Sequence, residues 1–475
     1  RVQVEVVLGG LLLLSAIAAG TSPWLYYTAT DGLAYVGSGL GWSGYLASVA
    51  GLALVVMLVP GTALGAVLPY LLRTLEEHTS APGETMGRLM AVNTTGSIVG
   101  SLAAGFVLLP LVGVWRALLL TATIYLALLM AVALHRIRLP TYRRTKIATS
   151  VTAVAALVAI FAIDVASLDT VRMSRPDAER VIDIREGSQA HVAVVARDDQ
   201  LRLRVNNFYT LGGTNALHAE RDQAALPLLL HPSAEQVFFL GMGTGITAGA
   251  SLAFPVEHVE VCELIGDVIT MAETHFAPWT AGLFDDERAR VYAEDGRTCL
   301  RRTDIRYDVI VSDLFTPWKA GTGNLYTLEH YEAARQRLQP GGRVVQWVPL
   351  YQVSEQELSI IANTMDAVFD EVLLYRGDLF ASRSIVALVG HGSAVPFDPT
   401  APVRQGRHLD ADEPTDADLQ AAALRLYVGN LTETGLYADR QRNTVDRPLV
   451  EYLAPQTHRD VRGGRASFMT GAERE

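Results

Sequence analysis

The chain has 475 residues, of which half are hydrophobic and 19% are charged, and its formal net charge at pH 7 is −11. This length suffices for two or three domains, and the negative charge argues against a nucleic acid as partner. The two cysteines, Cys262 and Cys299, are too few for a framework of disulfides or for a zinc site, so we expect both to pack as small apolar side chains. The chain begins at Arg1 rather than Met, so we also expect further sequence upstream.

The first third of the chain holds most of the apolar excess, in long runs with few charges. Each run is long enough, or nearly so, to cross about 30 Å of hydrocarbon as a helix. The candidate spans are Val4–Ala19, Gly44–Leu72, Leu89–Leu111, Trp115–Leu134 and Ile147–Ile163. We therefore predict a multi-pass α-helical membrane domain over residues 1–165, in contact with the lipid bilayer, whose first span is truncated.

Two of these spans carry small residues at helical spacing, Gly61-x-x-x-Gly65 and Gly96-x-x-x-Gly100. Small residues let helices approach closely in lipid, which indicates helix packing. A transport path is the alternative, and packing is the better interpretation because no span carries a buried acid or a pair of bases.

Positive charge predicts the orientation of the spans. The loop 135–146 holds five Lys or Arg residues and should be cytoplasmic, which puts the loop Arg73–Arg88 on the same side. If Ile147–Ile163 crosses fully, the following part emerges on the outer face, where a cytosolic nucleotide-type cofactor is not available. Either that segment does not cross, or the loop charge misleads, or the soluble part does not use the cofactor in the ordinary way.

Beyond a connector at 166–180, the chain has the pattern of a soluble α/β protein. Short alternating strands at 181–205 predict a small antiparallel β element. Strands and helices then alternate, which predicts a doubly wound parallel sheet in a Rossmann-like domain over 181–395. The predicted strands are Val237–Leu240, Val259–Cys262, Arg290–Tyr292, Asp308–Ser312, Arg343–Gln346, Glu371–Tyr375 and Ser384–Val389. Residues 396–475 read as a polar C-terminal extension.

The segment Gln236 to Glu263 reads as strand, glycine-rich turn, helix and strand. Its turn, Gly241–Gly245, can bend sharply, and the helix that follows offers free N–H groups to a ligand. Glu263 lies 22 positions after Gly241, a spacing that suits a ribose diol, although a solvated acid at a strand end is the plain alternative.

Three further polar positions follow predicted strands, where ligands of such sheets bind. Asp295-Gly296 is either a turn or a contact to the exocyclic amine of a base. Asp313 is either a capping acid or a group that acts on a nucleophile at the mouth of the cleft. Gln346 ends another strand, and the neighbouring Trp347 is expected to pack.

Taken together, these residues resemble the spermidine synthase family, the polyamine aminopropyltransferases and their membrane-fused multi-pass relatives. The likeness covers about Val181 to Gly390. The segments that match in order and spacing are Gly241–Gly245, Glu263, Asp295-Gly296, Tyr307–Asp313, Leu325-Tyr326 with His330-Tyr331, and Pro340–Gly342 with Gln346. Glu186, Gln189 and Glu220–Asp222 are similar to the family's N-terminal β region and gate.

The resemblance implies a methyltransferase-type Rossmann fold, a site for decarboxylated S-adenosylmethionine or S-adenosylmethionine as a substrate, and no metal. Glu263 would bind the ribose, Asp295 the adenine, and Asp313 would deprotonate the attacking amine. Substrate binding would fall to Gln346 and Tyr326. The residues implied in binding the nucleoside are Gly241, Gly243, Thr244, Gly245, Glu263, Asp295, Gly296 and Gln189.

The chain departs from the family at three polar anchors. Thr244 replaces an acid of the glycine turn, Thr316 replaces a second acid after Asp313, and the gate's Tyr-His-Glu aligns with Leu226-Pro227-Leu228. A multiply cationic amine needs several carboxylates to replace its water. Thr244 also removes a charge that would repel a carboxylate, so we expect intact S-adenosylmethionine to fit no worse than the decarboxylated form.

Two functions remain open from the sequence. The first is a membrane-anchored, aminopropyltransferase-like enzyme that transfers a group from (decarboxylated) S-adenosylmethionine to a small amine. The second is a catalytically inactive relative that serves as a structural or accessory subunit of a membrane complex. We favour the enzyme and expect an integral protein of the bacterial inner (plasma) membrane. A homodimer or a membrane-complex partner is compatible with either function.

Overall fold

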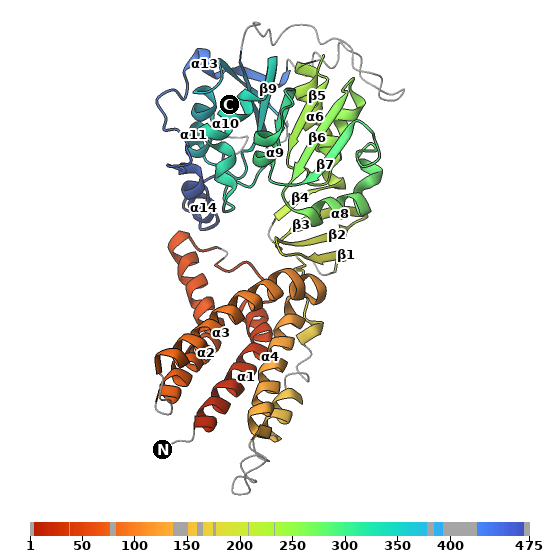
Figure 1. Ribbon diagram of the computed structural model, residues 1–475. Coiled ribbons are helices and arrows are strands. Elements are labelled where there is room, and N and C mark those ends of the chain that lie inside the picture. Colours follow the sequence, from red (N-terminus) through yellow and green to blue (C-terminus); the bar gives the residue numbers. More distant parts are fainter. Residues whose placement is uncertain are drawn as a thin grey trace. The chain divides into compact units, whose positions relative to one another are not determined.

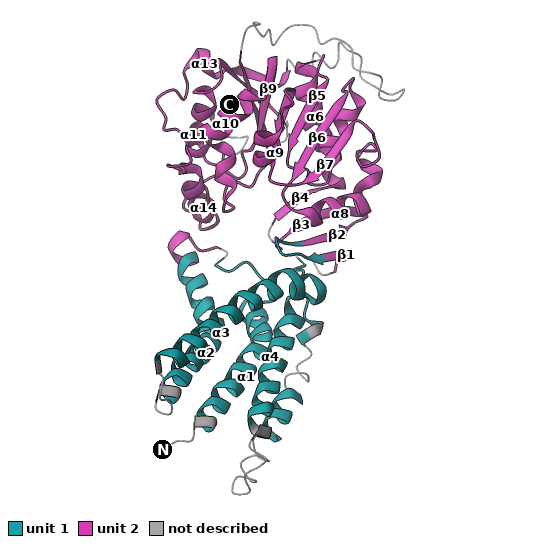
Figure 2. Cartoon of the chain, viewed as in Figure 1, with its two compact units in different colours: residues 1–37, 45–174, 185–191 teal, residues 38–44, 175–184, 192–475 magenta. Residues whose placement is uncertain are grey.

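The computed structural model describes residues 4–37, 39–76, 82–135, 151–158, 165–173, 177–207, 209–231, 233–377, 384–392 and 425–469. The chain divides into two compact units (Figure 2). Unit 1 comprises Arg1–Gly37, Tyr45–Ser174 and Arg185–His191, and unit 2 comprises Ser38–Gly44, Arg175–Ile184 and Val192–Glu475.

Long apolar helices make up most of unit 1 (Figure 1). They are α1 (Val4–Ala29), α2 (Trp42–Glu76), α3 (Pro82–Ala103), the π-helical turn η1 (Ala104–Leu108) and α4 (Leu109–His135). Helices α1 and α4 pack against each other through a cluster that includes Leu12, Ala16, Leu119, Ala122 and Leu126. A short 3-10 turn, η4 (Val165–Ser167), follows farther along the chain.

Three helical stretches are long and apolar enough to cross a membrane: Val6–Ala29, Trp42–Thr74 and Gly83–Val132. The last of these contains two predicted spans, and Gly113, with φ 78° and ψ 168°, interrupts its helical geometry between them. Length and composition are therefore compatible with membrane insertion at the first four predicted spans. The fifth, Ile147–Ile163, falls partly outside the described residues, which show a helix at 151–158.

The predicted small-residue faces of α2 and α3 are not used for packing within the described part of the chain. A Cβ atom added at Gly61, Gly65, Gly96 or Gly100 would meet no described atom within 4 Å. These glycines thus leave open helix surfaces.

A small sheet of four strands, in the order β1-β2-β3-β4, belongs mostly to unit 2. The strands are β1 (Glu179–Glu186), β2 (His191–Arg197), β3 (Gln200–Val205) and β4 (Tyr209–Gly213). The pairs β2/β3 and β3/β4 are antiparallel, as predicted for this segment. A buried ion pair of 2.9 Å connects Arg204 of β3 with Glu179 of β1.

The main sheet has eight strands in the order β12-β10-β11-β9-β8-β5-β6-β7 (Figure 1). They are β5 (Gln236–Leu240), β6 (His258–Glu263), β7 (Ala289–Ala293), β8 (Tyr307–Ser312), β9 (Leu338–Pro349), β10 (Glu371–Arg376), β11 (Ile385–His391) and β12 (Tyr427–Asn430). The five strands from β9 to β7 are parallel, as predicted.

The prediction of a purely parallel sheet is wrong at one edge, because β11 pairs antiparallel with both β9 and β10, and β12 pairs antiparallel with β10. The physical reason is the short connection between β10 and β11. A short link joins antiparallel neighbours, whereas parallel neighbours need a long crossover.

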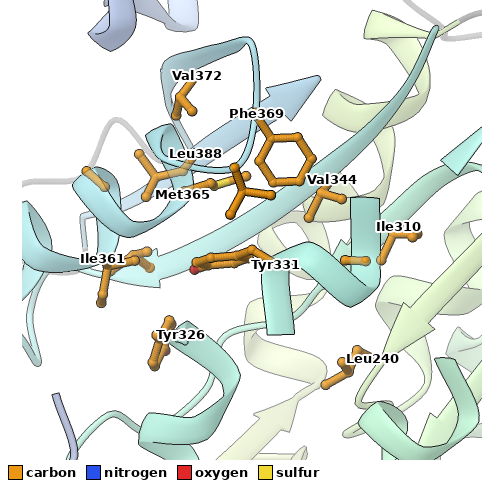
Figure 3. Packing of buried hydrophobic residues seen from close by; sticks show 14 of the residues in the cluster. Leu240, Ile310, Tyr326, Tyr331, Val344, Ile361, Met365, Phe369, Val372 and Leu388 are labelled. Carbon is orange, nitrogen blue, oxygen red and sulfur yellow. The ribbon is translucent and has the colours of Figure 1, made fainter. Parts of the chain in front are cut away.

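Helices and 3-10 turns connect and cover the strands of this sheet. The helices are α6 (Leu217–Leu230), α7 (Ile246–Ala250), α8 (Gly266–Phe276), α9 (Gly296–Arg302), α10 (Leu328–Gln336), α11 (Glu355–Asp366), α13 (Leu431–Thr434) and α14 (Leu449–Arg462). The 3-10 turns are η5 (Thr214–Ala216), η6 (Ser251–Ala253), η7 (Ala277–Trp279) and η8 (Thr322–Tyr326). Figure 3 shows Leu240, Ile310 and Val344 of the sheet in one buried cluster with Tyr331 and Ile361 of the helices.

The prediction that the cysteines are separate apolar side chains is wrong, since Cys262 and Cys299 form a disulfide. Cys262 lies near the end of β6 and Cys299 lies in α9, and both are buried. Two cysteines cannot build a framework of disulfides, but tertiary folding brings this single pair together across a sequence separation of 37 residues.

Candidate active site

The glycine-rich turn connects β5 to α7 at the carboxyl edge of the parallel strands. Gly241, Gly243 and Gly245 have φ of 88°, 57° and 80°, a left-handed backbone that favours glycine. The amide of Gly245 closes the turn by donating to the carbonyl of Met242 at 3.0 Å. The order of strand, turn, helix and strand expected for Gln236 to Glu263 is thus present.

Glu263 ends β6 and points back to this turn. Its Oε2 accepts hydrogen bonds from the amides of Met242 at 3.1 Å and Gly243 at 3.4 Å, and its Oε1 accepts from the amide of Ile265 at 3.0 Å. The carboxylate is buried. Glu263 is therefore a fixed acid beside the turn and not the solvated strand end of the plain alternative.

Asp313 follows β8, the neighbour of β5 on the other side. Its Oδ1 accepts from the amide of Leu314 at 2.7 Å. Burial raises the pKa of Asp313 to about 6, and the negative charge of Glu263 adds to this rise, so the two acids act on each other. A carboxylate whose pKa lies near neutrality can accept a proton from a substrate at physiological pH.

A third acid, Glu220 of α6, belongs to the same group. Its Oε1 accepts from the amide of Gly213 at 2.9 Å, and its Oε2 accepts from the hydroxyl of Thr244 in the glycine turn. Burial raises the pKa of Glu220 to about 7, and Asp313 contributes to the rise. Sequence reasoning named Glu220 only as part of a gate segment. The signal that could have found it is its spacing to Gln223, Ala224 and Pro227 on the buried face of α6.

Tyr209 of β4 contacts the segment that follows Asp313. Its hydroxyl donates to the carbonyl of Leu314 at 3.3 Å. Burial raises the pKa of Tyr209 far above its usual range, and Tyr351 and Asp313 raise it further. A hydrogen bond to Thr316 acts in the opposite direction and lowers this pKa. Thr316, which stands where the family has a second acid, is thus buried against a phenol.

Asp295 lies at the N-terminus of α9 as its capping residue. Its Oδ1 accepts from the amide of Arg297 at 2.9 Å, and its Oδ2 forms an ion pair with the guanidinium of the same arginine at 3.1 Å. Burial acts to raise the pKa of Asp295, but the contacts with Arg297 lower it below the usual value. The interpretation of Asp295 as a turn and capping residue therefore accounts for the contacts of both of its carboxylate oxygens. The next residue, Gly296, packs so closely that an added Cβ would lie 2.5 Å from Cγ of Leu240.

Buried polar atoms without partners lie on the strands beside Asp313. Ser312 and Gln346 are paired in the β8/β9 ladder, and Oγ of Ser312 and Oε1 of Gln346 find no hydrogen-bond partner among the described residues. The same holds for the hydroxyl of Tyr326, which is fully buried. Leaving such groups unpaired costs about 1–3 kcal/mol each, so they indicate a bound polar molecule or water. Trp347 packs, as expected, and donates to the carbonyl of Gln223 at 3.1 Å.

Gln189 is the one predicted site residue outside unit 2. It is exposed in the turn between β1 and β2, within the segment Arg185–His191 of unit 1. Its role in nucleoside binding therefore stays a prediction.

Comparisons with known proteins find relatives for part of unit 2. Residues 219–376 match the family model of the spermine/spermidine synthase domain. The chain is 30% identical over 310 residues to a polyamine aminopropyltransferase of Mycobacterium tuberculosis (strain ATCC 25618 / H37Rv), which covers 61% of this chain and 58% of the relative. It is 31% identical over 327 residues to a polyamine aminopropyltransferase of Corynebacterium efficiens, with 66% and 62% covered.

The chain thus spans less than two thirds of the length of these curated relatives. Among solved structures, spermidine synthase from Thermotoga maritima is similar, with 22% identity, a TM-score of 0.43, and coverage of 51% of this chain and 84% of that chain. The α/β part of this chain is therefore similar to the spermidine synthase family, through its match to the spermine/spermidine synthase domain and through its polyamine aminopropyltransferase relatives.

Proposed function

We propose that this protein is a membrane-anchored, aminopropyltransferase-like enzyme that uses decarboxylated S-adenosylmethionine and an amine acceptor. The single observation that carries the proposal is the pair Asp313 and Glu263, two interacting acids at the glycine turn, of which Glu263 is buried and Asp313 is half-buried. Because the pKa of Asp313 is raised to about 6, this group is mostly ionised at neutral pH and is still able to take up a proton.

In the proposed reaction the lone pair of the acceptor nitrogen forms a bond to the propyl carbon next to the sulfonium. The carbon–sulfur bond breaks, and its electron pair stays on sulfur, which leaves as a neutral thioether. The nitrogen loses one proton, which Asp313 accepts. Since a sulfonium is already a good leaving group, the protein's task is to align a neutral amine and remove this proton.

The other residues suit the binding of the donor. The amides of the glycine turn and the carboxylate of Glu263 line the position expected for a ribose. The unpaired oxygen atoms of Gln346 and Tyr326 are available to a polar substrate. Asp295 would have to share its oxygens with Arg297 to bind adenine, so we assign it a supporting role as the cap of α9.

Exposed apolar side chains support the membrane anchor. Met57 of α2, Val92 of α3, Phe106 of η1 and Leu111 of α4 are 67%, 70%, 69% and 76% exposed. Surfaces of this kind are unfavourable in water and stable in hydrocarbon. We propose the bacterial inner membrane as the location.

The disulfide favours a location of unit 2 on the outer side of that membrane, where a cytosolic donor is not available, so this observation supports the second candidate function given below and not the enzyme. Disulfides persist in oxidising compartments and are rare in the cytosol. The Cys262–Cys299 bond therefore agrees with the orientation inferred from the basic loop 135–146, which lies almost entirely outside the described residues.

An inactive accessory subunit is the second candidate. The observations that favour it are the ion pair that occupies Asp295 and the neutral Thr316 at the position of a second acid. Both reduce the number of carboxylates free to bind a polyamine.

Turnover by the full chain in detergent or lipid nanodiscs distinguishes the two candidates. We expect release of methylthioadenosine from decarboxylated S-adenosylmethionine in the presence of a suitable amine, tested over a panel of diamines and monoamines. Asp313→Asn should retain donor binding and lose transfer, whereas the exposed Asp304→Asn should behave as the unmodified protein. Absence of donor binding by the unmodified chain would leave the accessory subunit as the function.

A further inference from the structure

Glu220 holds an unusual position for an acid, buried next to the glycine turn. Its carboxylate is enclosed by backbone, because a Cβ atom added at Gly212 would lie 2.5 Å from its Oε1 and 3.0 Å from Cγ2 of Thr244. Hydrogen bonds from Gly213 and Thr244 fix both of its oxygens. The carboxylate therefore has one location and little freedom to leave it.

No cation compensates this charge among the described residues, since no Lys, Arg or His forms an ion pair with Glu220 there. Asp313, which is also negative, contributes to the raised pKa of Glu220. A buried carboxylate and a half-buried one that repel each other are unfavourable unless a positive group offsets them. A ligand that brings a cation would supply this offset.

An independent observation points to a ligand at the same place. The hydroxyl of Tyr326 is fully buried and has no hydrogen-bond partner in the described part of the chain. Its ring packs edge-on against Phe315, two residues after Asp313, with the ring centroids 6.3 Å apart. A buried polar group without a partner thus lies beside the segment that carries Asp313.

We propose that Glu220 is a specificity-determining residue whose carboxylate binds the primary ammonium group of the donor and disfavours a donor that retains its own carboxylate. This inference rests on the proposed function. It reverses the expectation from sequence that intact S-adenosylmethionine fits no worse than the decarboxylated form. Thr244 removes a negative charge from the turn itself. Glu220 of α6, however, places a carboxylate against the hydroxyl of that threonine.

The test compares three probes on the full chain in detergent: decarboxylated S-adenosylmethionine, S-adenosylmethionine and methylthioadenosine, which lacks the ammonium group. Loss of one charge-assisted contact is worth about 1.5–3 kcal/mol, or roughly 10- to 100-fold in affinity. Glu220→Gln should weaken the decarboxylated donor by that factor, bring its affinity close to that of the intact donor, and leave methylthioadenosine unchanged. The exposed Asp222→Asn on the same helix is the matched control.

Moving the charge provides a second variant. In the double variant Glu220→Gln, Thr244→Asp, the carboxylate sits in the turn itself, and we expect the preference for the decarboxylated donor to return. If Glu220→Gln also loses methylthioadenosine, Thr244→Val replaces it as the test. Thr244→Val keeps Glu220 but removes the hydroxyl that holds its carboxylate in place. It should lower the preference for the decarboxylated donor over the intact donor severalfold.

The outcomes separate this inference from the proposed function. If the unmodified chain binds all three probes and neither Glu220→Gln nor Thr244→Val changes the ratio of the two donors, Glu220 is not the specificity residue and the proposed function stands. If the unmodified chain binds none of the probes, both are overturned.

Discussion

Cys262 and Cys299 join the strand that ends in Glu263 to the helix that Asp295 caps. The bond lies one residue before Glu263 and four residues after Asp295, so it connects the two segments that the resemblance assigns to ribose and adenine. A covalent link at this place restrains the spacing of these segments and limits the conformations of the unfolded chain.

Removing the disulfide should destabilise unit 2. Closing a loop of this size by a disulfide stabilises a protein by about 2–4 kcal/mol, chiefly through the unfolded state. We expect the double variant Cys262→Ala, Cys299→Ala to lose roughly that much, measured by thermal or denaturant unfolding of the full chain. Titration of thiols in the denatured, unreduced protein is the control, and two free thiols would contradict the pairing.

The rate of transfer should depend on the ionisation of Asp313. A general base acts as the carboxylate, and burial with the charge of Glu263 raises the pKa of Asp313 to about 6. The rate should therefore rise with pH through about 6 and fall off below it, as measured by kcat/KM for the donor between pH 5 and 8. A profile that is flat across this range would exclude Asp313 as the base.

The same raised pKa predicts a cost in stability. The pKa of Asp313 in the unfolded chain is near its usual value of about 3.9, below the value of about 6 in the folded chain. Between these two pH values the folded state binds more protons than the unfolded state, so its stability decreases as pH rises. Above about pH 6 the full loss of folding stability from the ionised Asp313 is present. We expect Asp313→Asn to stabilise unit 2 by about 1–3 kcal/mol at pH 8 and to bring little gain near pH 3.5, as measured by denaturant unfolding.

The helix after the glycine turn should not tolerate a side chain at Gly249. A Cβ atom there would lie 1.9 Å from the carbonyl oxygen of Thr280, which is backbone and cannot rotate away. Gly249→Ala should therefore destabilise the domain by about 1–3 kcal/mol or more. Gly429→Ala on β12 is the matched control, since a Cβ there meets no described atom within 4 Å. Equal melting temperatures for the two variants would refute this close approach.

Asn443 should be the main attachment point of the C-terminal extension. It is fully buried, its Nδ2 donates to the carbonyl of Gly323 at 2.9 Å, and its Oδ1 accepts from the amide of Val450 at 3.1 Å. Asn443→Ala leaves both backbone groups unpaired, which costs about 2–4 kcal/mol in total. Proteolysis of the segment 425–469 should become faster in this variant. The exposed Gln336→Ala is the control, and equal cleavage rates would argue against the attachment.

Local pattern was enough to locate the elements that hold Glu263 and Asp313. Both acids directly follow apolar strand segments, and the carboxyl ends of parallel strands share one edge of the sheet, so their proximity could be predicted. The glycine turn was equally readable, because only glycine takes left-handed φ without cost at three nearby positions. The helices of unit 1 could be predicted from their length and apolar composition alone.

Only the tertiary structure decided which distant residues meet. Glu220 and Thr244 are 24 residues apart, and Cys262 and Cys299 are 37 apart, so neither pair leaves a mark in local periodicity. The antiparallel edge of the main sheet likewise depends on how β10 and β11 pair after a short connection. Such contacts follow from how helices and strands pack across the sheet, which is a property of the whole domain and not of any one segment of sequence.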